Sequence, residues 1–195
     1  MGKSIKGTKT EKNLLMAFAA ESQTRNLYTY FANAARSHVN KAGYEQIANI
    51  FNETAENEKV HARVFFNYLE SRNIKIAVDY LSSTIKDTES NLESAVADEK
   101  MEWITNYANF EKIAIEEGFP EIASAFNKIA KAKKHHESRF RKLINNIANG
   151  EVFNKKKAAR WHCINCDYIF ECYKAPKECP VCKHPQIFCE LLSEN

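Results

Sequence analysis

The sequence has little that would interrupt a helix. Its 195 residues include five glycines and four prolines, and neither type occurs between Gly43 and Gly118. This scarcity favours long helices over turn-rich architectures. No run of about 18 apolar residues is present, so no transmembrane helix is expected, and the polar stretch 1–10 lacks the apolar run of a signal peptide. The net charge of +3 is too small to indicate a nucleic-acid or membrane partner.

What the sequence does have is helical periodicity. Four segments repeat apolar residues at helical spacing and predict helices at 9–37, 42–71, 88–117 and 120–149. Thr10 is the expected cap of the first helix, and Pro120 suits the first turn of the fourth. The segment 72–87 is too long for a tight turn. We therefore expect a mainly α fold, a four-helix bundle in which this segment crosses from one helix pair to the other.

All six cysteines lie after residue 160, and four of them form two Cys-x-x-Cys pairs, Cys163 with Cys166 and Cys179 with Cys182. In a chain without an export signal such pairs indicate a metal site rather than disulfides, so we expect a cytoplasmic protein. Four thiolates bind iron or zinc, and spacing alone does not choose between them. The segment from Trp161 onward is too short to hold a core without a metal. The basic stretch 155–157 is expected to be a solvated tether rather than a nucleic-acid patch.

Each predicted helix also places an ionisable side chain on or beside its apolar face near mid-length. Glu58 and His61 are three residues apart beside the seam of Phe51 and Phe65, so both point the same way. A buried acid is costly unless a partner offsets its desolvation. Acids and histidines from four helices at matching heights are the arrangement of a carboxylate-bridged two-metal site, which suits iron or manganese. The residues concerned are Glu21, Glu58, His61, Glu99, Glu102 and His136.

The third helix is expected to keep a regular seven-residue repeat through this region. That spacing aligns Glu99 with Asn106, and it aligns Glu102 with Asn109 on the neighbouring row. Both asparagines are therefore expected on the same side of the helix as the two acids.

Taken together, these motifs resemble the rubrerythrin family, which joins a ferritin-like di-iron bundle to a C-terminal rubredoxin-like domain. The resemblance extends from about Thr8 to Leu192. It is carried by short stretches on every predicted helix and by the cysteine module, namely residues 10–14 (TEKNL), 19–23 (AAESQ), 58–62 (EKVHA), 99–102 (EKME), 136–140 (HESRF), 175–176 (AP) and 184–185 (HP). The domains expected are a ferritin-like bundle at 1–150, a linker at 151–160 and a rubredoxin-like domain at 161–195.

The resemblance implies a non-haem iron peroxidase that reduces hydrogen peroxide to water. It implies one iron held by the four cysteines and one or two irons held by the six bundle residues, with zinc or manganese as substitutes. A redox protein would donate the electrons, and a homodimer would bring the cysteine iron of one subunit near the bundle of its partner. His61 and Glu102 would exchange at one iron, while Tyr28 and Tyr107 are candidates for hydrogen bonds near the site.

One position departs from the family. The bridging glutamate should lie three residues before His136, where this sequence has Lys133. Lys133 is seven residues from both Phe126 and Phe140, which places it on the buried seam. Three outcomes are open: an ammonium among the carboxylates, a deprotonated amine that binds metal, or a side chain bent to solvent beside a weakened site. We favour weakened, altered or single-metal occupancy over a normal two-metal site.

The cysteine module departs less from the family. Asp167 stands where a glycine is usual after the second cysteine, and aspartate tolerates the left-handed conformation better than most residues. Cys172 and Cys189 are additional thiols, expected to be structural rather than redox-active, although they could compete for metal or oxidise.

Two other functions stay open at this point. Lys133 could have disabled peroxide chemistry and left an electron carrier or an iron-binding protein. A zinc-ribbon interaction module on a helical scaffold is a weaker alternative, because it leaves the inward acids unexplained. Metal content separates the three. The peroxidase requires about three irons per chain, the carrier one cysteine iron with one bundle metal or none, and the ribbon a colourless zinc protein.

Overall fold

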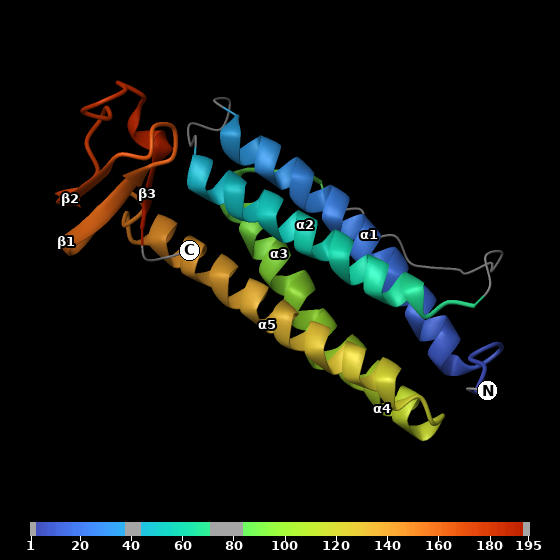
Figure 1. The fold of residues 1–195 in the computed structure, drawn as a ribbon. Coiled ribbons are helices and arrows are strands. Elements are labelled where there is room, and N and C mark those ends of the chain that lie inside the picture. Colours follow the sequence, from blue (N-terminus) through green and yellow to red (C-terminus); the bar gives the residue numbers. More distant parts are fainter. Residues whose placement is uncertain (1–2, 38–43, 71–83, 193–195) are drawn as a thin grey trace.

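The computed structural model describes residues 3–37, 44–70 and 84–192, which form a long helical bundle with a small β-rich module at one end (Figure 1). The helices are α1 (Lys9–Arg36), α2 (Glu45–Asn67), α3 (Thr88–Met101), α4 (Tyr107–Glu116) and α5 (Pro120–Ala148). A π-helical turn, η2 (Glu102–Asn106), joins α3 directly to α4.

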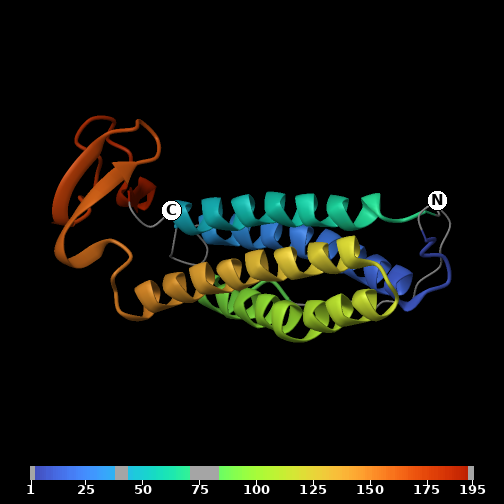
Figure 2. The same ribbon diagram turned by 60° about the horizontal axis from the view of Figure 1, so that its bottom comes forward.

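The helices pack as two pairs (Figure 2). α1 runs along α2, and α5 runs along the rod made of α3, η2 and α4. The predicted mainly α fold with four long helical segments is confirmed. Most of the predicted crossover, 72–87, lies outside the described residues. None of the helices in the described part of the chain is long and apolar enough to cross a membrane.

The first helix begins at a different cap from the one predicted. Thr8 is the N-cap, and its hydroxyl accepts a hydrogen bond from the backbone N–H of Glu11 at 3.1 Å. Thr10 is fully buried, and its hydroxyl donates to the Glu117 carboxylate at 2.6 Å. The prediction was wrong because both threonines precede the apolar repeat, and only the packing of α1 against the end of α4 decides which hydroxyl faces the open helix end.

The π-helical turn changes which residues of the third helical segment are buried. A π-helix needs one residue more per turn than the regular repeat allows, so every later position shifts around the axis. Tyr107 and Phe110 consequently take the buried places expected for Asn106 and Asn109. Asn106 is half-buried and Asn109 is exposed. The expectation for both asparagines was wrong because the repeat was assumed to continue unbroken past the acids.

The bundle interior is layered along its length. One apolar cluster includes Tyr28, Phe51 and Phe140, and a second includes Leu14 and Phe126. In each helical segment the predicted site residues, together with Lys133, lie in the sequence between members of one cluster and members of the other. The acids and histidines therefore form a polar layer closed at both ends by packed aromatic side chains.

The C-terminal module is a three-stranded antiparallel sheet with strand order β2-β1-β3. Its elements are β1 (Asn154–Cys163), β2 (Ile169–Lys174), the short 3-10 helix η3 (Gln186–Phe188) and β3 (Cys189–Leu191). Trp161 is fully buried at the centre of its small core. Residues 154–160, which were predicted as part of a linker, belong to β1 in the structure.

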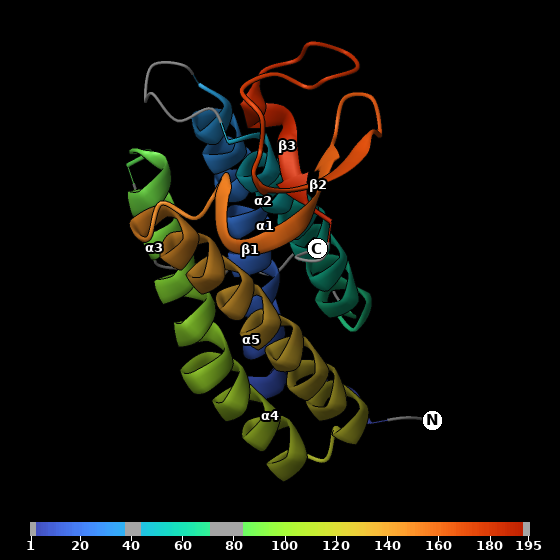
Figure 3. The ribbon, with the colours of Figure 1, turned by 90° about the vertical axis from the view of Figure 1, so that its left-hand side faces the viewer.

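The module lies beyond the end of the bundle where α5 finishes and α2 starts. Figure 3 views the molecule from this end, with the three strands nearest the viewer. The Tyr44 and Phe153 rings are 6.0 Å apart, and Lys155 Nζ donates to Asn146 Oδ1 at 3.2 Å. Aromatic packing and a hydrogen bond thus join the module to the helices.

Candidate metal centres

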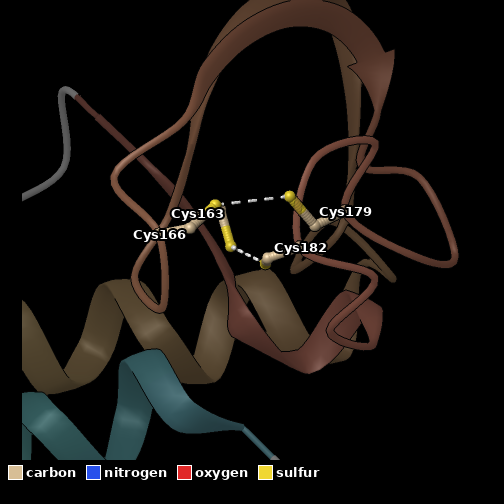
Figure 4. A group of neighbouring side chains, drawn as sticks. All are labelled: Cys163, Cys166, Cys179 and Cys182. Carbon is tan, nitrogen blue, oxygen red and sulfur yellow. Dashed lines mark hydrogen bonds between the residues drawn. The ribbon is translucent and has the colours of Figure 1, made fainter.

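The four cysteines of the two Cys-x-x-Cys pairs meet in space. Cys163 and Cys166 lie on one side and Cys179 and Cys182 on the other, with their sulfur atoms turned toward one another (Figure 4). The Sγ atoms of Cys163 and Cys182 are 3.7 Å apart, and those of Cys166 and Cys179 are 3.6 Å apart. Four sulfurs about 2.3 Å from a central ion would lie about 3.8 Å from each other in a tetrahedron. The spacing therefore suits a tetrahedral thiolate site.

Each cysteine pair sits on a tight turn that ends in the left-handed conformation. Asp167 has φ 63° and Lys183 has φ 61°, and both directly follow the second cysteine of a pair. The backbone N–H of Asp167 donates to the carbonyl of Cys163 at 2.8 Å, and that of Lys183 donates to the carbonyl of Cys179 at 3.1 Å. The expectation that aspartate can adopt this conformation is confirmed, so the turn does not require the glycine.

The thiols of this group differ in acidity. A backbone hydrogen bond from His184 lowers the pKa of Cys182 to about 6. A backbone hydrogen bond from Tyr168 favours the thiolate of Cys166, but burial and the neighbouring sulfur atoms raise its pKa to about 12. Four adjacent thiolates repel one another, so all four ionise together only when a cation sits among them.

The two additional cysteines belong to the core of the module rather than to this group. Cys189 is buried against Trp161 and Leu191. Cys172 packs against the same cluster, and its Sγ donates to the carbonyl of Lys174 at 2.9 Å. Neither is among the four sulfurs that converge. Their surroundings match the structural role expected for them.

The six ionisable residues of the bundle also come together. Glu21, Glu58 and Glu99 are fully buried, Glu102 and His136 are nearly so, and His61 is half-buried. Among the described residues, two overlapping groups offer converging ligand atoms. One is Glu21 with Glu58 and His61, and the other is Glu58 with Glu99 and His136. Glu102 belongs to neither group, because its carboxylate faces Lys133.

Lys133 occupies the centre of this polar layer. Its side chain is fully buried, and Nζ donates a close hydrogen bond to Glu58 Oε2. Nζ also lies 2.7 Å from Glu102 Oε2, 3.1 Å from Glu21 Oε2 and 3.7 Å from Glu99 Oε2. The predicted outcome in which Lys133 bends to solvent is therefore wrong, because four buried carboxylates attract the side chain inward more strongly than water does.

The surroundings favour the charged form of some groups in the polar layer and the neutral form of others. Burial opposes the charge on Lys133, but the carboxylates of Glu102, Glu21 and Glu58 outweigh it and hold the lysine pKa well above its usual value. Lys133 is therefore held as an ammonium in the metal-free protein. Burial raises the pKa of Glu102 to about 7 against the attraction of Lys133. Burial and the neighbouring Glu58 raise the pKa of Glu21 well above that of an ordinary carboxyl group.

The histidines respond to the same carboxylates. Burial would lower the pKa of His61, but the neighbouring carboxylates of Glu21 and Glu58 raise it to about 9. Burial likewise opposes the charge on His136, while Glu58 and Glu99 raise its pKa. In the metal-free protein, protons on these groups therefore offset part of the carboxylate charge. Metal binding to them would release protons.

Two tyrosines hold the acids in place from outside the layer. Tyr28 O–H donates to Glu99 Oε1 at 2.8 Å, and Tyr107 O–H makes a close hydrogen bond to Glu21 Oε1. Both hydrogen bonds agree with the prediction. The sequence did not indicate the partner of Glu137, whose carboxylate accepts from Trp103 Nε1 at 2.6 Å and from Arg141 Nε at 2.8 Å.

Both halves of the molecule match models of the same protein family. A family model described as rubrerythrin matches residues 12–144, and a model of the rubredoxin-like domain of rubrerythrin matches residues 161–188. The chain belongs to the rubrerythrin family. Rubrerythrins are oxidoreductases that bind iron, and their two domains correspond to the bundle and the cysteine module described above.

Several rubrerythrins resemble the chain along its whole length. A rubrerythrin of Porphyromonas gingivalis is 48% identical over 100% of this chain and 96% of its own. Rubrerythrin-1 of Clostridium acetobutylicum is 48% identical over 99% of each chain. A solved structure of fully reduced, all-ferrous nigerythrin superimposes with a TM-score of 0.63 at 26% identity, covering 97% of this chain and 92% of that one. The ferritin-like fold of the bundle is thereby confirmed.

The two centres differ in how well they suit the irons of the family. The four cysteines suit one iron, because their sulfur atoms all lie within 4.8 Å of one another and two pairs are 3.6 and 3.7 Å apart, close to the spacing of a tetrahedral site. In the bundle, Glu58 Oε1 and His136 Nδ1 lack a hydrogen-bond partner among the described residues and lie 3.1 Å apart, as expected for two atoms that share an ion. Two ions do not fit equally well, since the Lys133 ammonium stands among the oxygens that a second ion would need.

Proposed function

We propose that this protein reduces hydrogen peroxide to water with electrons that enter through an iron bound by the four cysteines. The observation that carries the proposal is the pairing, in one rubrerythrin-family chain, of a tetrahedral thiolate group with a buried layer of acids and histidines. The reaction consumes two protons and two electrons for each peroxide and yields two water molecules. A one-electron redox protein is the proposed donor.

Each half of the chain has a separate task in this proposal. Cys163, Cys166, Cys179 and Cys182 would hold an iron that changes between its +2 and +3 states with little movement of its ligands. Glu58, Glu99 and His136 would hold metal where peroxide can bind. His61 suits proton delivery, because its side chain is 12% exposed and its pKa is raised to about 9.

The distance between the cysteine module and the bundle site within one subunit favours a homodimer. The cysteine module adjoins the start of α2 at Glu45, whereas Glu58 lies 13 residues further along that helix, which is about 20 Å at 1.5 Å per residue. Electron transfer slows steeply with distance. We therefore propose that the cysteine iron of one subunit serves the bundle of its partner. We also keep a cytoplasmic location as a proposal, because free thiols that bind metal require a reducing compartment.

A second function is favoured by Lys133. Its ammonium replaces a bridging carboxylate by a cation at the centre of the layer. A chain with such a site could carry electrons or bind iron without turning over peroxide. The burial of Lys133 is the observation that keeps this alternative open.

Peroxide consumption by the iron-loaded full-length protein, supplied with a reduced redox protein, tests the proposal. We expect consumption that is lost in Cys182→Ser, because electrons could no longer enter. Subunit roles are tested by mixing Cys182→Ser with His136→Gln, since a mixed dimer has one intact pair of centres. Restored activity in the mixture supports transfer between subunits. Absence of turnover in the unmodified protein, with its irons in place, would favour the carrier.

A further inference from the structure

The two oxygens of one carboxylate can contact two different cations, and two carboxylates of this layer do so. The Oε2 atoms of Glu21, Glu58, Glu99 and Glu102 all lie within 3.7 Å of Lys133 Nζ. The Oε1 atoms of Glu58 and Glu99 instead face His136 Nδ1, at 3.1 and 3.4 Å. Two carboxylates are therefore shared between the ammonium on one side and the histidine on the other.

The group that contains His136 keeps its ligand atoms available. Glu58 Oε1 and His136 Nδ1 lack hydrogen-bond partners among the described side chains although both are buried. Glu99 Oε1 accepts only one hydrogen bond that is described, from Tyr28, and a carboxylate oxygen has a second lone pair to offer. Two oxygens and one imidazole nitrogen suit a divalent first-row ion such as iron or manganese.

The group that contains His61 differs in its contact with Lys133, although His61 Nδ1 and Glu21 Oε2 also lack a hydrogen-bond partner among the described side chains. His61 Nδ1 faces Glu21 Oε2 at 3.5 Å and Glu58 Oε2 at 3.7 Å. Both of these oxygens are in contact with Lys133 Nζ. An ion bound there would share the same oxygen atoms with the ammonium, so the two cations would lie close together and repel each other.

We propose that the bundle holds a single metal ion at Glu58, Glu99 and His136, with the Lys133 ammonium in the place of a second ion. Glu58 then bridges a metal and an ammonium rather than two metals. Tyr28 orients Glu99 toward the ion through its hydrogen bond. Glu21 and Glu102 pair with the ammonium, His61 faces Glu21 and Glu58, and of these residues only the shared Glu58 supplies a ligand to the metal. The inference rests on the proposed function only in that the bundle binds metal. One bundle ion is fewer than the two of a full peroxidase, so the proposed peroxide reduction would use a single bundle iron.

Metal counting on the full-length protein tests the inference, with iron and manganese supplied in turn and unbound metal removed. We expect two ions per chain, one in the cysteine group and one in the bundle. Glu99→Gln should lose the bundle ion and Glu21→Gln should keep it. Both changes replace a buried carboxylate by an amide of the same shape, but Glu99 belongs to the group with His136 and Glu21 to the group with His61. His136→Gln and His61→Gln form a second pair with the same expected contrast, in case one glutamine variant does not fold.

The charge at position 133 is tested separately. Lys133→Glu should raise the count to three ions per chain, whereas Lys131→Glu, on the exposed side of the same helix, should leave it at two. Three ions in the unmodified chain, one ion only, or loss of the bundle ion in Glu21→Gln but not in Glu99→Gln would each overturn the inference. Because counting does not depend on turnover, an inactive protein with two ions would contradict the proposed function and leave the single-ion site intact.

Discussion

Replacing Lys133 by methionine isolates the contribution of its charge to folding. Methionine keeps a long apolar stem but brings no ammonium, so Lys133→Met leaves the surrounding carboxylates without their shared cation. Removing one partner of a buried ion pair costs about 3–5 kcal/mol, because the remaining charge stays buried and unpaired. We expect a loss of this size in the free energy of unfolding of the metal-free protein at pH 8.

The loss should shrink at lower pH, and its sign follows from the carboxyl groups. Lys133 lowers the pKa values of Glu21, Glu58 and Glu102, so without it the folded state binds protons more tightly. A folded state that binds more protons than the unfolded state loses stability as the pH rises. Glu102, whose pKa is about 7 even with Lys133 present, is one of the groups that would take up a proton at pH 5.5.

Denaturant unfolding followed by the helical circular dichroism signal measures both effects, at pH 5.5 and pH 8. Lys131→Met is the matched control, because Lys131 is exposed on the same helix and its substitution should change stability by less than about 0.5 kcal/mol. A Lys133→Met protein as stable as the unmodified chain at pH 8 would refute the reasoning. It would mean that the carboxylates do not need the ammonium.

Three further predictions concern other contacts. The pKa of His61 is raised from 6.5 to about 9, so protonation of its side chain stabilises the folded state. This stabilisation is fully present below pH 6.5 and is lost as the pH rises through 9. Unfolding of the metal-free protein should therefore show a fall of about 3 kcal/mol at most over this interval, flattened in His61→Gln. Tyr28→Phe should cost about 1–3 kcal/mol in denaturant unfolding, because a buried oxygen of Glu99 loses its donor. Cys182→Ser should abolish metal binding by the module and shift Trp161 fluorescence while the helical signal of the bundle persists.

Much of the fold could be predicted because its signals are local. The apolar repeat that ends at Gly118 and resumes at Pro120 marks a helix boundary that the structure keeps. The burial of Lys133 followed from its seven-residue spacing to Phe126 and Phe140, both of which are fully buried. The convergence of the cysteines followed from their paired spacing.

What could not be predicted depends on contacts between distant segments. The π-helical turn at Glu102–Asn106 has no marker in the sequence, since no glycine or proline accompanies it. Its consequence, that Asn106 is only half-buried and Asn109 is exposed, was therefore missed. The division of carboxylate oxygens between Lys133 and His136 depends on how four helices meet, and no spacing along one helix can reveal it.

Anomalous diffraction at the iron edge from crystals of the iron-loaded full-length protein tests the central claim most directly. We expect one peak among the four cysteines and one peak beside His136, with the Lys133 side chain extended between Glu21 and Glu102. Two peaks of equal height on either side of Glu58, with Lys133 displaced from the layer, would contradict it.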